Sequence, residues 1–196
     1  MPRVIAGECK GLMLKAPKGE RTRPTTDKVK EALFSILQRE IPDALFLDLF
    51  AGSGQIGIEA VSRGAKSAVL VDENRDAVAA INENIQKTRL ERKVRLIRRD
   101  VLAALRELGS GPDTFDIVYM DPPYDLAVTM FRKIAESLCE RKLLSPGAVV
   151  ILEHRAEDTV PENVINLTFY RRCKYGTTML TFYTTDTCYS GGTPSA

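Results

Sequence analysis

Short apolar runs alternate with amphipathic stretches along most of this chain. Five runs have the length and composition of β-strands: residues 44–50, 67–71, 93–98, 115–120 and 148–152. Apolar positions at helical spacing fill the intervals between them: residues 55–63, 75–87, 101–108 and 126–139. Strands that alternate with helices of this length form βαβ units, so the pattern predicts a parallel sheet covered by helices on both faces.

Two further apolar segments, residues 164–170 and 177–184, follow the fifth strand. The link between them, residues 171–176, is too short for the crossover that a parallel pair needs, so we expect an antiparallel hairpin. The predicted fold class is therefore α/β, a doubly wound and mostly parallel sheet of seven strands whose last pair is an antiparallel hairpin.

A further helix is predicted before the first strand of the sheet. Thr25 or Thr26 can cap this helix, because a threonine hydroxyl accepts a hydrogen bond from the first helical turn. Apolar positions between residues 29 and 37 share one face of the helix. We therefore expect this face to pack on the body of the protein, while Lys28 and Lys30 remain in solvent.

The pattern divides the chain into three parts. Residues 1–40 form a basic N-terminal extension, in which residues 3–5 and 12–14 pair as a small hairpin before the helix. Residues 41–185 form the domain that contains the sheet. Residues 186–196 are rich in Gly, Ser and Thr, and we expect this tail to be disordered.

Composition places the chain among ordinary folded proteins. With 196 residues, of which 44% are hydrophobic and 28% charged, it is large and apolar enough for a core, which excludes a wholly disordered protein. It contains no apolar run of spanning length and no N-terminal signal pattern. Its four cysteines are scattered, which argues against a zinc knuckle or a disulfide framework. We expect a cytoplasmic monomer without a metal site or a membrane partner.

The net charge of +2 conceals two opposite regions. Residues 1–30 carry eight Lys or Arg and three acids, so this segment has a net charge of +5, whereas the remaining 166 residues have a net charge of −3. A basic segment on a mildly acidic body is typical of a protein that binds a polyanion such as a nucleic acid. A solvated basic arm without a partner is the alternative.

A glycine-rich segment follows the first predicted strand of the sheet. Gly52, Gly54 and Gly57 fit the spacing G-x-G-x-x-G between a strand and a helix, and Asp72 ends the second strand 20 residues after Gly52. Glycines at such a turn let a ligand approach the backbone, and an acid at this distance commonly binds a ribose hydroxyl. The pattern indicates a cofactor that contains a nucleoside, with a purely structural glycine turn as the alternative.

The acids decide which nucleoside cofactor is expected. Asp48, Asp72, Asp100 and Asp121 each follow or end one of the first four strands, so they should gather at the carboxyl edge of the sheet. Carboxylates would repel the pyrophosphate of a dinucleotide but attract the sulfonium and ammonium of S-adenosylmethionine. Asp72 would then bind the ribose of this cofactor, and Asp100 would bind its adenine. For Asp100, a cap on the following helix is an equally good interpretation.

The most specific motif is Asp121-Pro122-Pro123-Tyr124, directly after the fourth strand. Two prolines in series fix the backbone, and the motif offers a carboxylate at Asp121, a backbone carbonyl at Pro122 and an aromatic ring at Tyr124. Two acceptors and a stacking ring suit the exocyclic amine of a nucleic-acid base. The hydrogen bonds from the amine to these two acceptors become stronger as the nitrogen becomes tetrahedral. They therefore stabilise the transition state and accelerate methyl transfer. The alternative is a rigid turn with a surface tyrosine.

Together these motifs resemble a known family. Asp48-x-Phe-Ala-Gly-Ser-Gly54 followed by Asp121-Pro-Pro-Tyr124 resembles the class I S-adenosylmethionine-dependent methyltransferases, which have a Rossmann-like sheet. The segments Ile5-Ala-Gly7 and Arg23-Pro-Thr-Thr-Asp27 are similar to the bacterial 16S ribosomal RNA guanine-N2 methyltransferases of the RsmD type. The resemblance extends to about Thr184. Only Gln55 departs from it, since a small or apolar residue is commoner there.

The resemblance implies an activity and a set of site residues. The expected reaction is transfer of a methyl group to the N2 amine of a guanine in small-subunit ribosomal RNA, within the RNA or an assembly intermediate. Residues expected to bind the cofactor are Asp48, Gly52, Ser53, Gly54, Asp72, Asp100 and Thr25. Those expected to receive the guanine are Asp121, Pro122 and Tyr124. RNA contacts are expected from Arg3, Lys10, Arg21 and Arg23, together with Tyr124.

Other functions remain open from the sequence. Adenine-N6 and cytosine-N4 DNA methyltransferases also use D-P-P-Y, although this chain has no insertion of the size of a target-recognition domain. A non-catalytic RNA-binding or ribosome-assembly protein on the same fold is a second alternative, which the intact motifs disfavour. A protein-glutamine methyltransferase and a dinucleotide oxidoreductase fit the motifs less well.

Overall fold

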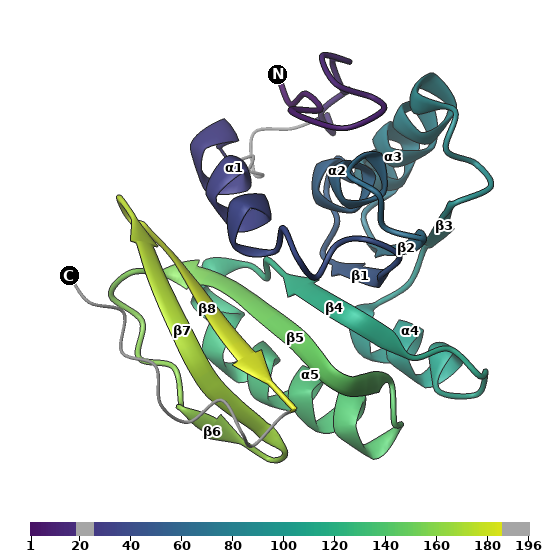
Figure 1. The fold of residues 1–196 in the computed structure, drawn as a ribbon. Coiled ribbons are helices and arrows are strands. Elements are labelled where there is room, and N and C mark those ends of the chain that lie inside the picture. The colour runs from purple at the N-terminus through teal and green to yellow at the C-terminus, as the bar shows by residue number, and fades with distance from the viewer. Residues whose placement is uncertain (19–25, 186–196) are drawn as a thin grey trace.

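A mixed sheet of eight strands forms the centre of the molecule in the computed structural model, which describes residues 1–18 and 26–185 and, at Tyr124, the backbone alone (Figure 1). The strand order is β3-β2-β1-β4-β5-β8-β7-β6. The strands are β1 (Leu45–Leu49), β2 (Ser67–Val71), β3 (Val94–Ile97), β4 (Phe115–Met120), β5 (Leu144–Arg155), β6 (Asn163–Val164), β7 (Leu167–Tyr175) and β8 (Thr178–Thr184). The first five are parallel, and the others pair antiparallel with their neighbours.

Helices cover both faces of the sheet, as the alternation predicts (Figure 1). They are α1 (Asp27–Ile36), α2 (Gln55–Ser62), α3 (Arg75–Thr88), α4 (Val101–Leu108) and α5 (Ala127–Glu140). Consecutive residues of a strand point to opposite faces. Phe46 accordingly belongs to the apolar cluster formed with α1, α2 and α3, and Leu47 to the cluster formed with α4 and α5. Among the described residues, none of the helices is long and apolar enough to cross a membrane.

The C-terminal strands differ in detail from the prediction. The hairpin is confirmed, but β7 continues to Tyr175, so its turn is shorter than the predicted link. Gly176 supplies a left-handed residue there, with a φ of 64°. The sheet gains an eighth strand because two residues of β6 pair with the start of β7. Such a short edge pair has too weak an apolar pattern to be recognised from sequence.

The first 18 residues, here called the arm, are built into the core. Val4 and Leu14 are fully buried, and the predicted hairpin is reduced to a single antiparallel bridge between Arg3 and Met13. Gly7 adopts a φ of 83° against α2, where a Cβ atom would lie 1.7 Å from the carbonyl oxygen of Ser62. Any larger residue at Gly7 would therefore lift the arm from the helix.

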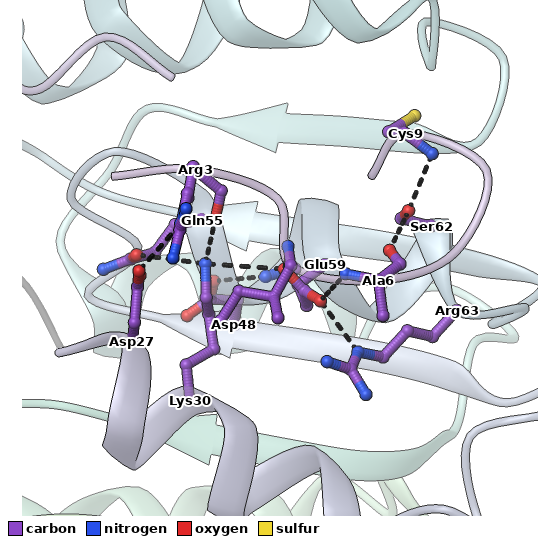
Figure 2. Close-up of polar contacts among 12 residues, drawn as sticks. Arg3, Ala6, Cys9, Asp27, Lys30, Asp48, Gln55, Glu59, Ser62 and Arg63 are labelled. Atoms are coloured by element: carbon purple, nitrogen blue, oxygen red, sulfur yellow. Dashed lines mark hydrogen bonds and ion pairs between the residues drawn. The ribbon is translucent and has the colours of Figure 1, made fainter. Parts of the chain in front are cut away.

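The prediction that Lys30 remains in solvent is wrong. Its side chain is fully buried, and its ammonium donates to the carbonyl of Arg3 and lies 3.4 Å from Glu59 Oε2 (Figure 2). Glu59 on α2 also accepts from the backbone N–H groups of Ile5 (2.8 Å) and Ala6 (2.9 Å), and from Arg63 Nε (2.8 Å). This buried carboxylate thus joins the arm, α1 and α2 at one point.

The cap of α1 is Thr26, whose hydroxyl accepts from the N–H of Val29 at 3.4 Å. Several predicted features lie outside the described residues. They are the candidates Thr25, Arg21 and Arg23 and the tail 186–196.

Candidate active site

A cleft of about 630 Å³ opens at the carboxyl ends of the parallel strands. Strand order reverses here, because β1 has β2 on one side and β4 on the other. Open α/β sheets bind ligands at such a switch point, since the loops leave the sheet in opposite directions and expose its edge. The cleft is therefore where the fold itself favours a ligand.

The glycines after β1 have three different roles. Gly52 has a φ of 57°, and a Cβ atom there would meet nothing within 4 Å, so this turn leaves its backbone open beside the cleft. Gly54 begins α2 with a φ of 74°. A Cβ atom on Gly57 would lie 2.1 Å from Leu70 Cδ2, so this glycine lets α2 pack closely on β2. Only the first exposes backbone to a ligand.

Two acids are fixed around this loop, Asp48, which is buried, and Asp72, which is half-buried. The N–H of Gly57 donates to Asp48 Oδ2 (3.0 Å), and the N–H of Gly52 donates to Asp72 Oδ2 (2.8 Å). Burial raises the pKa of Asp48 to about 7, and the bond from Gly57 only partly offsets it. Burial likewise raises the pKa of Asp72, against the N–H groups of Asn74 and Gly52. Without a bound cation, the cleft therefore disfavours the anionic form of both carboxylates.

Asp100 is placed for both of the roles considered for it. Its carboxylate caps α4 by accepting from the N–H of Ala103 (3.0 Å), and the residue also lines the cleft beside Arg99. One carboxylate oxygen is used in the cap. A carboxylate can accept several hydrogen bonds, so the cap leaves room for a ligand contact.

The end of β4 brings Asp121 to the cleft, close enough to Glu153 of β5 for their charges to interact. Asp121 and Pro122 line the cleft, and burial, followed by the charges of Glu153 and Asp48, raises the pKa of Asp121 well above its usual range. Glu153 is itself buried, and Tyr119 donates its hydroxyl hydrogen to Glu153 Oε2. A cation placed here would relieve the mutual repulsion of these acids.

One wall of the cleft comes from the arm, which the sequence did not indicate. Ala16 and Pro17 line the cleft, and the side chain of Asn84 on α3 holds the residue before them. Asn84 Oδ1 accepts from the N–H of Lys15 (2.7 Å), while its amide nitrogen donates to the carbonyls of Lys15 (2.9 Å) and Ser53 (2.8 Å). Asn84 therefore fixes the arm and the glycine loop to each other.

The structure brings most of the candidate residues together but separates the basic ones. Those that line the one cleft are Asp48, Gly52, Ser53, Asp72, Asp100, Asp121 and Pro122. Gly54 packs against Leu70 instead. Arg3 forms an ion pair with Asp27 (2.8 Å), and Lys10 is exposed on the arm. No sequence motif identifies Glu153 and Asn84 as residues of the site. The only signal for them in the sequence is an acid or an amide within an otherwise buried segment.

The Asp48→Asn substitution should stabilise the protein without cofactor at high pH. Asp48 binds its proton more tightly in the folded state, so its contribution to stability is full near pH 4 and falls as the pH rises to about 7. Asparagine keeps an acceptor for Gly57 and avoids this loss, which amounts to as much as about 4 kcal/mol at pH 8. Urea unfolding of both proteins at pH 5 and pH 8 measures it. If the free energies of unfolding of the two proteins changed equally between pH 5 and pH 8, the raised pKa of Asp48 would be contradicted.

Comparisons with known proteins show the family of this chain. Residues 2–184 match the family described as "Conserved hypothetical protein 95". "Putative rRNA methyltransferase YlbH" of Bacillus subtilis is 35% identical over 92% of this chain and 97% of its own length. "Ribosomal RNA small subunit methyltransferase D" of Escherichia coli K12 is 31% identical over 86% of this chain and 82% of its own length. The chain belongs to the RsmD family.

A solved structure supports the same conclusion for the fold. "Putative methyltransferase yhhF from Escherichia coli" superimposes with a TM-score of 0.80 at 31% identity, over 93% of this chain and 96% of that one. The Rossmann-like methyltransferase fold is therefore confirmed for this RsmD-family chain. The family match spans the arm as well as the sheet, in keeping with an arm that shares the core of the body.

Proposed function

We propose that this protein transfers a methyl group from S-adenosylmethionine to the N2 amine of a guanine in small-subunit ribosomal RNA. The observation that carries the proposal is the arrangement of Asp121 and Pro122 beside the glycine loop in one acidic cleft. The names of the family relatives support the ribosomal RNA substrate. The D-P-P-Y motif supports an exocyclic amine as the acceptor.

The residues of the cleft suit this cofactor. When bound, S-adenosylmethionine supplies a methyl group on a positively charged sulfonium. Asp48 and Asp121 favour a cation because each is held near other carboxylates in a buried setting. The open backbone at Gly52 and the carboxylate of Asp72 suit the methionine and ribose parts, and Asp100 suits the adenine amine. Ser53 lines the same cleft. Thr25, which lies outside the described residues, is proposed as a further cofactor contact.

Asp121 and Pro122 are proposed to orient the attacking nitrogen. The guanine amine has two hydrogens, and the Asp121 carboxylate and the Pro122 carbonyl are two acceptors at the rim of one cleft. Tyr124 would stack on the base, which must leave its own stack at a cost of a few kcal/mol. Because the pKa of Asp121 is raised, its carboxylate is also able to take the proton that the methylated nitrogen releases.

RNA is proposed to bind through its phosphates to basic residues of the arm and of the segment that follows it in the sequence. Arg3, Lys10, Arg21 and Arg23 are the proposed contacts. The ion pair of Arg3 with Asp27 is exposed and worth little in water, so phosphate can compete for this guanidinium.

Identification of the methylated nucleoside tests the proposal. Purified protein, labelled S-adenosylmethionine and protein-free or particle-bound 16S ribosomal RNA are incubated, and the RNA is digested to nucleosides. The expected product is N2-methylguanosine at a single position. Synthetic duplex DNA in the same assay tests the runner-up, adenine-N6 or cytosine-N4 methylation. N6-methyladenine or N4-methylcytosine as the main product would overturn the proposal.

A further inference from the structure

A second strongly basic segment lies far from the arm in the sequence. Residues 89–99 carry six Lys or Arg and one acid, a net charge of +5, equal to that of residues 1–30. The segment runs from the end of α3 through β3 to the rim of the cleft. The side chains of Arg89, Arg92, Arg95 and Arg98 are all exposed.

The fold places the beginning of this segment against the tip of the arm. Cys9 Sγ lies 3.6 Å from the carbonyl oxygen of Thr88, Lys93 Nζ lies 3.3 Å from Glu8 Oε1, and Lys87 Nζ donates to the carbonyl of Met13 at 2.5 Å. Two positively charged segments, about 80 residues apart in the chain, thus meet at one surface. We call it the basic surface and define it as Lys10, Lys87, Arg89, Arg92, Lys93 and Arg95.

Carboxylates do not neutralise this surface fully. Glu8 pairs with Lys93, and Glu107 is shared between Arg95 (3.0 Å) and Arg99 (2.7 Å). Within residues 1–18 and 26–185, no ion pair involves Lys10, Arg89 or Arg92. Like charges gathered without matching anions raise the energy of the free protein, and an external polyanion would lower it.

Arg89 occupies a backbone position that glycine normally fills. It ends α3 in the left-handed conformation, with a φ of 58°. Helices most often end with glycine or asparagine in this conformation because a Cβ atom is unfavourable there. Glycine would suit this backbone conformation better than arginine does. The backbone therefore does not explain the arginine, and its exposed charge is the property that remains to be explained.

Protection of an edge strand accounts for only part of the pattern. β3 lies at one edge of the sheet, and charged residues on an edge strand prevent pairing with other chains. Within residues 89–98, however, only Arg95 of the basic surface lies in β3; Arg89, Arg92 and Lys93 precede the strand. Four of the five basic residues at 89–98 are arginines, and a guanidinium matches phosphate with two parallel hydrogen bonds.

We infer that the basic surface binds the phosphate backbone of the ribosomal RNA substrate, at a distance from the base that reacts. Both segments lead from this surface to the cleft: the arm reaches its wall at Ala16 and Pro17, and the residues after β3 reach it at Arg99. RNA held on the surface would therefore have further basic residues, Lys15 on the arm and Arg98 and Arg99 after β3, on its way to the site of reaction. The inference rests on the proposed function only in taking RNA as the substrate.

Charge removal in matched sets tests the inference. The surface variant is Lys10→Gln, Arg89→Gly and Arg92→Gln; the control variant is Arg39→Gln, Lys133→Gln and Lys174→Gln, which removes the same charge from exposed positions elsewhere. Affinity for protein-free 16S ribosomal RNA is measured from about 50 to about 300 mM salt. Since each phosphate contact adds about 0.7 to 0.9 to the salt slope, three lost contacts should lower the slope by about 2 to 3, and the surface variant should bind at least about 30-fold more weakly near 50 mM salt. The control variant should keep most of the affinity and the slope.

Further readouts separate the inference from its competitors. Because Arg89→Gly suits the left-handed turn, the melting temperature of the surface variant should be unchanged or higher than that of the wild type. Equal losses in both variants, or a loss in neither, would overturn the inference. The inference would also be overturned if the surface variant bound the small ribosomal subunit more weakly but bound protein-free 16S ribosomal RNA as well as the wild type. That result would indicate a contact with a ribosomal protein. If the surface variant loses RNA affinity but the wild type does not form N2-methylguanosine, the docking surface stands and the proposed reaction falls.

Discussion

Asp121→Ala is expected to lower kcat for methyl transfer by at least about 100-fold, the usual cost of removing a group that acts on charge in the transition state. The carboxylate accepts a hydrogen of the amine most strongly as the nitrogen gains positive character, so its loss is felt in the transition state more than in binding. Removing this charge also relieves the repulsion from Glu153 and Asp48, so the variant should be at least as stable as the wild type. Single-turnover methylation with saturating RNA measures the effect.

Asp121→Asn is the matched control for this prediction. Asparagine keeps an acceptor oxygen but neither the charge nor the ability to take a proton. Its rate should lie between those of the wild type and Asp121→Ala, and cofactor and RNA affinities should change by less than about tenfold in both variants, since these interactions strengthen mainly in the transition state. Methylation at the wild-type rate by Asp121→Ala would remove Asp121 from the mechanism.

Glu59→Gln is expected to lower the free energy of unfolding by about 3–5 kcal/mol, the range for a buried ion pair that loses one partner. The Lys30 ammonium is fully buried and would lose the only carboxylate that lies within 4 Å of it among the described residues. The introduced amide could still accept from the arm backbone, but it has one acceptor oxygen for the two N–H groups of Ile5 and Ala6. Urea unfolding at pH 7 measures the loss.

The double variant Glu59→Gln with Lys30→Met shows whether the unpaired charge is the cause. Methionine fills the place of the lysine stem without an ammonium, so the double variant should recover a large part of the stability lost in Glu59→Gln. If the double variant were as unstable as the sum of the two single variants, the loss would arise from the contacts of the arm and not from the buried charge.

The sheet and the cleft could be predicted from the sequence because their signals are local. Periodicity distinguishes strands from helices, and acids such as Asp48 and Asp121 at the ends of parallel strands must share one edge of the sheet. The same reasoning applies to the glycine turn, where Gly52 and Gly54 have positive φ values. The antiparallel pairing of the C-terminal hairpin followed from the length of its link alone.

The contacts of the arm could not be predicted because they join distant parts of the chain. A count of charges treats Lys30 and Arg3 as free cations, yet each has a carboxylate partner on another segment. Glu59 lies in a helix in which every residue is buried, so the pattern shows no face that marks its role. Since Val4 and Leu14 are buried, deletion of the arm would remove core as well as charge, and point substitutions are the better test of RNA binding.

Asn84 binds the arm through both backbone groups of Lys15 and the glycine loop through the carbonyl of Ser53. This one amide therefore joins two segments that line the same cleft. Equilibrium coupling between two ligands is reciprocal, so any ordering of the arm that favours the cofactor must be matched by an equal gain for RNA once the loop is occupied. If the arm holds RNA and the loop holds the cofactor, as proposed, the two substrates of one reaction are effectors of each other through this amide.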